Sequence, residues 1–160
     1  MNIQSPQRAA HAYVQRLVAP PERVFPLLCP VREADWIEGW RPTFVASDSG
    51  VGETDCVFAT AAEPHDAIWY VTRHEPDAGF IEMLKITPGV TACRFTIGLH
   101  AMAQGCDATV TYRHTSLGTP AGDAFVASFT AEHYVAFMRD WEARLNHYLV
   151  HGTALQGARD

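Results

Sequence analysis

The feature that most constrains the fold is a long segment near the end of the chain that contains neither proline nor glycine. It covers residues 123–151, and its large apolar side chains recur mostly at steps of three or four residues. This spacing predicts a helix with one apolar stripe, which must be buried against another element. A helix of about 30 residues would be roughly 45 Å long, enough to cross a whole sheet. The stripe consists of Val126, Phe129, Tyr134, Phe137, Met138, Trp141, Leu145 and Tyr148.

Most of the chain before this segment has the pattern of short β-strands. Residues 8–18 predict a first strand, and apolar and polar side chains alternate cleanly in residues 91–99 and 108–116. A strand with one apolar face packs that face against another layer, which we expect to be the long helix. Glycine and proline separate most of the six later strands, which favours an antiparallel meander. These strands are expected at 42–47, 54–61, 66–75, 79–86, 91–102 and 107–117.

Prolines place two short helical pieces between the first and second strands. Proline is tolerated in a first helical turn, so a helix is expected to start near Pro20. Pro26 falls too deep for a regular helix, so a break is expected from there to Pro30, with a second piece from Pro30 to Trp36. The predicted fold class is α+β, with a curved antiparallel sheet of about seven strands, two short helices and a long C-terminal helix. We expect one domain at residues 8–152, with flexible tails at 1–7 and 153–160.

Charge and composition exclude several kinds of partner. Twelve basic and eighteen acidic residues give a net charge of −6, which argues against a nucleic acid or an anionic membrane surface as partner. No stretch approaches the roughly 20 apolar residues that span a bilayer, and the first ten residues lack the apolar centre of a signal peptide. None of the four cysteines forms a C-x-x-C pair. We therefore expect a cytoplasmic protein with free thiols and without membrane insertion.

The order of the predicted elements resembles the START-like superfamily, also called SRPBCC or helix-grip, and most of all its small bacterial polyketide cyclase-like members. The residues that carry the resemblance are APPERVFPLL (19–28), PVREADWIEGW (30–40), SDSG (47–50), Trp69 and WEARL (141–145). The resemblance implies a ligand cavity between the concave sheet face and the long helix. The superfamily includes lipid carriers, hormone receptors, aromatase/cyclases and chaperone activators, so it fixes no function. No catalytic motif of the superfamily can be matched, and the catalytic residues stay unknown.

Inward-facing side chains are expected to line a cavity of roughly a few hundred Å³. Strand alternation and the helix stripe select the candidates. The predicted ligand-binding residues are Trp69, Phe95, Ile97, Tyr112, His114, His133 and Phe137. His133 and His114 either orient a polar ligand or are core side chains bonded to a neighbour. Glu33 on the second short helix is either a solvated charge or an acid/base partner of His133.

No cofactor or metal is expected. The sequence contains neither a G-x-S-x-G elbow nor a glycine-rich phosphate loop. His147 and His151 are four residues apart at the end of the predicted helix, but no third metal ligand is evident.

Three functions are compatible with this pattern. The first is binding of a small hydrophobic or aromatic metabolite in an internal pocket. The second is a cyclase- or dehydratase-type enzyme acting on a polyketide-like substrate, and the third is a protein-interaction module. A small hydrophobic ligand is the expected partner, and a homodimer is an option.

Overall fold

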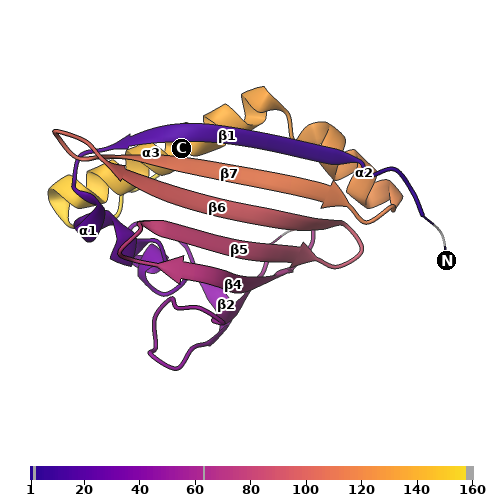
Figure 1. Cartoon of the computed structure of the whole chain (residues 1–160), viewed down its shortest axis with the longest axis horizontal. Coiled ribbons are helices and arrows are strands. Elements are labelled where there is room, and N and C mark those ends of the chain that lie inside the picture. Colours follow the sequence, from indigo (N-terminus) through magenta and orange to yellow (C-terminus); the bar gives the residue numbers. More distant parts are fainter. Residues whose placement is uncertain (2, 63, 158–160) are drawn as a thin grey trace.

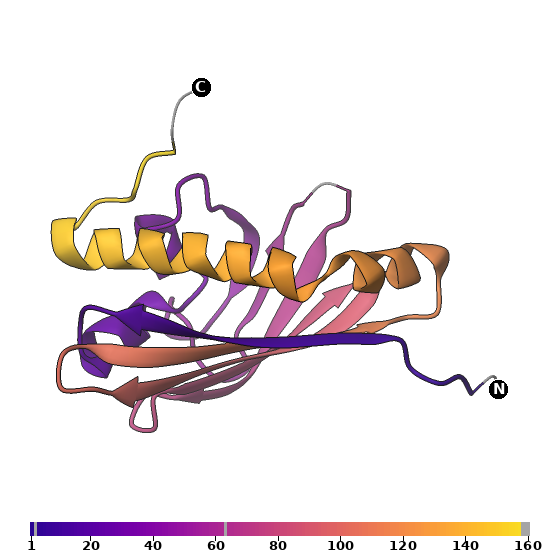
Figure 2. The same cartoon turned by 90° about the horizontal axis from the view of Figure 1, so that it is seen from above.

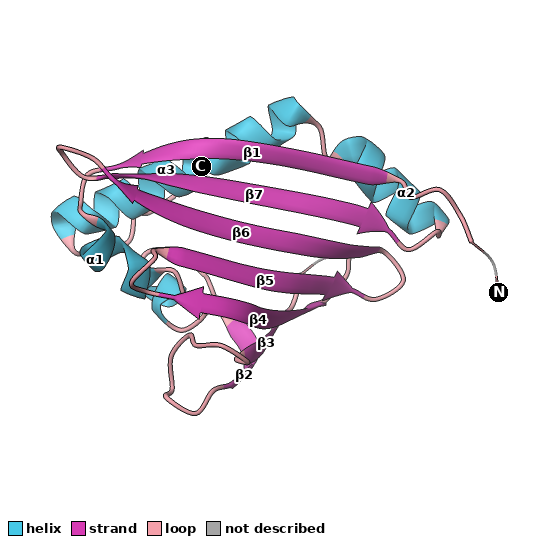
Figure 3. Cartoon of the chain, in the orientation of Figure 1, coloured by secondary structure: helices cyan, strands magenta, loops and turns pink. Residues whose placement is uncertain are grey.

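The computed structural model describes residues 1, 3–62 and 64–157 of the chain. These residues form one antiparallel sheet of seven strands in the order β1-β7-β6-β5-β4-β3-β2 (Figures 1 and 3). The prediction of an α+β helix-grip architecture is confirmed. The strands are β1 (Arg8–Leu17), β2 (Pro42–Ala46), β3 (Val57–Thr60), β4 (Ala67–Glu75), β5 (Phe80–Thr87), β6 (Thr91–Ala101) and β7 (Cys106–Ser116). The helical elements are α1 (Pro21–Val24), the 3₁₀ helices η1 (Phe25–Leu27) and η2 (Arg32–Asp35), α2 (Pro120–Ser128) and α3 (Ala131–His151).

The expected long helix is two helices, so the prediction of one helix over residues 123–151 is wrong. The break lies at Phe129, whose backbone leaves the helical conformation after α2. His11 on β1 donates its Nε2 proton to the Phe129 carbonyl at 2.8 Å. Thr130 then caps α3, because its hydroxyl accepts a bond from the His133 N–H at 3.2 Å. Figure 2 shows α2 and α3 following each other along one face of the sheet.

Helix α3 is fastened to the free edge of the sheet. Glu142 accepts a bond from the Arg16 N–H at 2.9 Å, and Asn146 donates to the Arg16 carbonyl at 2.9 Å. Asn146 also accepts from the Val18 N–H at 3.0 Å. From inside the sheet, buried Gln15 donates to the Met138 carbonyl at 3.1 Å. These bonds satisfy backbone groups of an edge strand that would otherwise be open to another chain.

The buried face of α3 differs by part of a turn from the predicted stripe. Its buried residues are Tyr134, Met138, Trp141, Leu145 and Leu149. His133 is exposed, and Phe137 keeps 42% of its surface accessible. The prediction that these two side chains face the interior is wrong, because each helical residue turns by about 100°, so Phe137 and Met138 cannot both point at the sheet.

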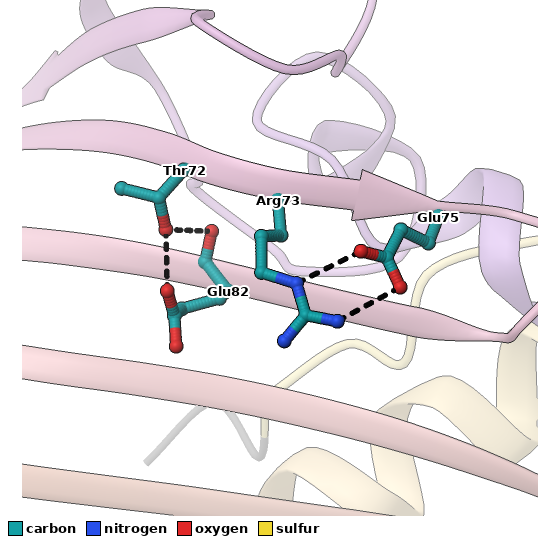
Figure 4. A network of polar contacts seen from close by, with 4 residues as sticks. All are labelled: Thr72, Arg73, Glu75 and Glu82. Carbon is teal, nitrogen blue, oxygen red and sulfur yellow. Dashed lines mark hydrogen bonds and ion pairs between the residues drawn. The ribbon is translucent and has the colours of Figure 1, made fainter.

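A β-bulge interrupts β4. The register with β5 shifts between Val71 and Arg73, and Thr72 is the extra residue. The Thr72 hydroxyl faces two acceptors of Glu82, the carbonyl at 3.1 Å and the carboxylate at 2.9 Å (Figure 4). Arg73 makes a two-bond ion pair with Glu75 at 2.8 and 3.0 Å. A bulge of this kind bends its strand and changes which later side chains point inward.

Short helical pieces lie between β1 and β2, as predicted. Pro26 lies within η1, directly after α1, so the break expected near it is found. The Phe25 ring contacts His74 of β4, with the ring centroids 4.9 Å apart. Trp36, at the end of η2, is completely buried and donates its indole N–H to the Leu27 carbonyl at 3.0 Å.

The segments that flank the sheet and α3 also touch the rest of the molecule. The segment after α3 bonds back to the rest of the molecule. Arg144 of α3 donates to the Leu155 carbonyl at 3.4 Å, and the Gly157 N–H donates to Glu38 at 2.7 Å. Residues 2 and 158–160 of the predicted tails lie outside the described residues. Within the described part of the chain, no helix is both long and apolar enough to span a membrane.

Truncating Trp141 should destabilise the protein far more than truncating Phe137. Trp141→Ala removes a buried ring that packs on Phe95 and Trp36, and should lower the free energy of unfolding by about 3–5 kcal/mol. Phe137→Ala, the matched control on the same helix, should cost less than about 1.5 kcal/mol because this ring is 42% exposed. Urea unfolding of both variants measures the difference. Equal losses would contradict the assignment of the buried face.

Candidate functional site

Five aromatic rings lie between the sheet and α3, four from strands and one from the helix. We call them the inner aromatic wall: Phe58, Trp69, Phe95, Tyr112 and Trp141. Phe58 stacks on Trp69 with centroids 5.4 Å apart, and Trp69 meets Phe95 edge-on at 6.1 Å. Phe95 in turn contacts Tyr112 at 4.6 Å and Trp141 at 6.5 Å. All five are less than a tenth exposed. Edge-to-face and stacked pairs of this kind hold each other in place.

The seven predicted site residues fall into two groups. Trp69, Phe95, Ile97, Tyr112 and His114 are buried on the inner face, where alternation puts them. Exposed His133 contacts Phe129 at its ring edge, with centroids 5.9 Å apart. Phe137 is exposed as well, yet its ring lies 6.0 Å from that of Tyr112. Phe137 therefore lies at the margin of the interior, where the space between α3 and the sheet meets the solvent.

The interior is more closely packed than expected. Two hollows among the described residues lie outside the space between the sheet and α3. One, of about 390 Å³, lies between residues 4–7 and 115–118, and the other, of about 400 Å³, lies beside residues 102–107. We expected a cavity lined by the predicted residues between the sheet and α3. In that space the aromatic rings of Trp69, Phe95 and Tyr112 contact one another instead.

His114 is a neutral, incompletely bonded group within the aromatic interior. It is 1% exposed, and the rings of Phe125 and Phe129 lie 4.8 and 4.6 Å from its own. Its Nδ1 has no hydrogen-bond partner among the described residues. Burial, together with the positive charge of Lys85, lowers the pKa of His114 to about 4. At neutral pH it is an uncharged imidazole with one ring nitrogen still able to bond a ligand.

Lys85 is a site residue that the sequence analysis missed. It lies on β5 opposite Trp69 of β4 and Cys93 of β6, and Cys93 is opposite His114, so these four residues form one row across four strands. The Lys85 Nζ is 5.0 Å from the centre of a Trp69 ring. Burial lowers the pKa of Lys85, and burial raises the pKa of the Cys93 thiol to about 11. The signal was available, since Lys85 is the only lysine of the sequence and shares the alternation of Ile81 and Met83.

Glu33 on η2 is the third polar group of the interior. Part of this residue reaches the surface, but its carboxyl group is shielded from water, and this burial raises its pKa to about 8. The Glu33 charge is in turn one of the influences, after burial, that raise the pKa of Tyr112. His133, the hypothesised acid/base partner of Glu33, is exposed. At neutral pH Glu33 is largely a neutral acid that can donate a hydrogen bond.

No metal centre is built from the described residues, which contain no group of three potential ligands. The rings of His147 and His151 lie 4.4 Å apart at the end of α3. Cys29, Cys56, Cys93 and Cys106 are free and buried. We predict that a chelator of divalent ions leaves the melting temperature unchanged.

Comparison with known proteins identifies the fold. No protein-family model matches the sequence, and no curated protein matches it. Solved structures do match. Norcoclaurine synthase from Thalictrum flavum, in complex with dopamine and hydroxybenzaldehyde, is 14% identical with a TM-score of 0.65, over 92% of this chain and 90% of that chain. An uncharacterised protein from Rhizobium leguminosarum is 16% identical with a TM-score of 0.63, over 93% of this chain and 99% of that chain.

A third neighbour is longer than the present chain. DynU16, a protein of the dynemicin biosynthetic locus, is 20% identical with a TM-score of 0.60 over 90% of this chain. The match covers 48% of DynU16, so the present chain spans about half the length of that protein. At these identities the similarity establishes the fold alone, which agrees with the helix-grip architecture that the sequence resemblance implied.

His114 should make the protein less stable in acid. Its pKa is about 4 in the folded state and near 6.5 when unfolded, so the unfolded state binds the extra proton as the pH falls from 6.5 to 4. Stability should drop by up to about 3 kcal/mol over this range and stay level above pH 6.5. His114→Phe keeps an aromatic ring and should remove this part of the slope. Urea melts at pH 7, 5.5 and 4 measure it, and an unchanged slope in the variant would contradict the assignment.

Glu33 should act in the opposite direction. The pKa of Glu33 is raised from 4.5 in the unfolded chain to about 8 in the folded state, so between these pH values the folded state keeps a proton that the unfolded state has lost. The free energy of unfolding is therefore highest below pH 4.5 and falls as the pH rises to 8. Glu33→Gln cannot ionise. As the pH rises from 5 to 8, the free energy of unfolding of this variant should increase by several kcal/mol, at most about 5, relative to that of the parent protein. Thermal melts at both pH values test this. Glu38→Gln, a substitution of an exposed carboxylate, is the control and should leave the pH profile unchanged.

Proposed function

We propose, on the premise that this chain has the START-like helix-grip fold, that it binds a small aromatic or hydrophobic molecule against the inner aromatic wall. The observation that carries the proposal is the combination of this wall with the incompletely bonded Nδ1 of His114. Ligand sites are mostly apolar and contain a few polar groups that fix the ligand's orientation. His114 and Glu33 are polar groups of this kind, and both are largely uncharged at neutral pH.

A ligand enters beside Phe137. This ring is 42% exposed and contacts Tyr112 of the inner aromatic wall, so it lies between solvent and interior. Because the interior rings are in mutual contact, a ligand needs space that side-chain movement provides. Phe137 is free to rotate outward at little cost in buried area, which makes it the natural element to move. Its exposure is then explained by function rather than by packing.

Two structural neighbours support an aromatic ligand without establishing one. Norcoclaurine synthase, which shares the fold, was solved with dopamine and hydroxybenzaldehyde, two small aromatic compounds. DynU16 belongs to a biosynthetic locus, but only about half of it corresponds to this chain. We therefore propose small aromatic molecules, including phenols and aromatic carbonyl compounds, as the first class to examine.

An enzyme of the cyclase or dehydratase type is the second candidate. The specific observation in its favour is that burial shifts two pKa values in opposite directions. The pKa of Glu33 is raised to about 8, and the pKa of His114 is lowered to about 4. Such groups supply a proton donor and a proton acceptor at neutral pH. Conversion of a bound ligand, lost in both Glu33→Gln and His114→Phe, would support this candidate over simple binding.

The outer face of the sheet supports the third candidate, a protein-interaction module. Ile68 lies opposite Ile86 and Tyr70 opposite Leu84 on the solvent side of β4 and β5. Each of these side chains is 38–51% exposed. Exposed apolar patches on a sheet favour association, and a homodimer through this face would appear in sedimentation as a concentration-dependent mass.

The binding proposal predicts that a charge at position 137 weakens an apolar ligand. Nile red, a neutral dye, should bind the protein with increased fluorescence and be displaced by 2-naphthol. Phe137→Glu should weaken dye binding about tenfold, equivalent to 1.4 kcal/mol, because it places a carboxylate at the entrance. Val150→Glu, on the same helix and 64% exposed, is the matched control and should bind like the parent. Equal dye affinity in the two variants would overturn the proposed entrance.

A further inference from the structure

Lys85 differs from the arginines that the structure describes. The sequence contains twelve basic residues, and Lys85 is its only lysine. The arginines that the structure describes are exposed or half-buried, and Arg94 and Arg113 point to the outer face of the sheet. Lys85 instead shares its face of β5 with buried Ile81, Met83 and Thr87. The one lysine is therefore on the inner face.

The surroundings of Lys85 leave its amine available. Its Nζ lies 5.0 Å from the centre of a Trp69 ring, and the residue opposite it on β6 is Cys93. The ion pairs formed by the described residues are Arg32–Asp35, Arg73–Glu75 and Arg144–Asp140, and they do not involve Lys85. Lys85 is half-buried, so part of its side chain meets the solvent. An amine held in this way lies between an aromatic surface and the solvent.

Lysine and arginine differ in the chemistry they offer at such a position. A guanidinium group stays protonated in proteins, whereas an amine loses its proton more readily when it is buried. Burial lowers the pKa of Lys85, and the thiol of Cys93 opposes this only in part. The neutral amine is a nucleophile toward carbonyl carbon, a reaction that desolvated lysines carry out in other proteins.

We propose that Lys85 is a nucleophilic amine that forms a Schiff base with an aldehyde or ketone bound against the inner aromatic wall. This inference rests on the proposed function, since the carbonyl compound occupies the same site beside Trp69. It adds a covalent step to noncovalent binding at that site.

The step balances without an oxidant or reductant. The nitrogen lone pair of Lys85 attacks the carbonyl carbon, a C–N bond forms, and the carbonyl π pair moves to oxygen, which takes up a proton. The resulting carbinolamine loses its hydroxyl with one further proton as water, while the nitrogen releases its protons and the C=N bond forms. The sum is carbonyl compound plus amine giving imine plus water. Protons pass through the water that reaches this half-buried residue.

A purely structural role for Lys85 gives a different expectation. The Nζ over the Trp69 ring is a cation–π contact, and arginine makes such contacts as well as lysine does. Lys85→Arg therefore preserves a structural cation while removing the amine. A structural role predicts no difference in carbonyl chemistry between the two proteins, since neither would react at this position.

The test is reductive trapping with 4-hydroxybenzaldehyde and sodium cyanoborohydride, followed by mass spectrometry of the intact protein and its peptides. The reductant adds hydride to the imine and leaves a stable secondary amine. Since the chain holds one lysine, the α-amino group at its end is the other primary amine and serves as an internal reference. Lys85 should be labelled about tenfold faster than this reference, a barrier difference of 1.4 kcal/mol. 4-Hydroxybenzyl alcohol, which lacks the carbonyl, should slow labelling of Lys85 but not of the α-amino group.

Two outcomes would overturn the inference. One is labelling of Lys85 no faster than that of the α-amino group, and the other is labelling that the alcohol does not slow. Lys85→Arg should lose the adduct at position 85 and keep the reference label. If this variant fails to fold, protection by the alcohol in the parent protein decides the question alone. Displacement of Nile red by the alcohol, measured on the same protein, separates the two proposals: displacement without an adduct refutes the Schiff base and leaves the binding function standing.

Discussion

The rest of the structure depends on how α3 is attached to the open edge of β1. Glu142 and Asn146, one turn apart on the helix, bond the backbone of Arg16 and Val18, and buried Gln15 bonds the helix backbone in return. An edge strand needs partners for its free N–H and C=O groups, and here the helix supplies them. The attachment sets both the position and the rotation of α3 over the sheet.

This attachment explains why the interior is unevenly covered. Helix α3 lies closest to β1, and α2 lies over β7 and β1, so the inner face of β4 and β5 is further from both. Phe137 meets the solvent at that margin although its ring contacts Tyr112. Lys85 on β5 is half-buried for the same reason. The proposed entrance, the aromatic wall and the half-buried position of the single lysine therefore follow from one geometrical fact, a helix held to one side of a curved sheet.

The inner face could be predicted from the sequence because side-chain direction in a strand is a local property. Period-two alternation placed Phe95, Ile97, Tyr112 and His114 inward, and all four are buried. The rotation of α3 could not be predicted equally well, because the apolar positions of the helix include both Phe137 and Met138. Hydrogen bonds to β1 decide between them, and these join residues more than 120 positions apart.

By itself the sequence determined the succession of strands and helical segments and the strand faces, since proline, glycine and apolar periodicity act over a few residues. The helix-grip architecture was implied by the resemblance that this succession carries. Only the tertiary structure decided the break at Phe129, where His11 of β1 binds the freed carbonyl. It also decided the directions in which the pKa values of Glu33, Lys85 and His114 are shifted, because a pKa shift depends on what surrounds a group in space. Burial and electrostatic neighbours come from distant parts of the chain, so the chemistry of this interior emerges only when the sheet and helices enclose it.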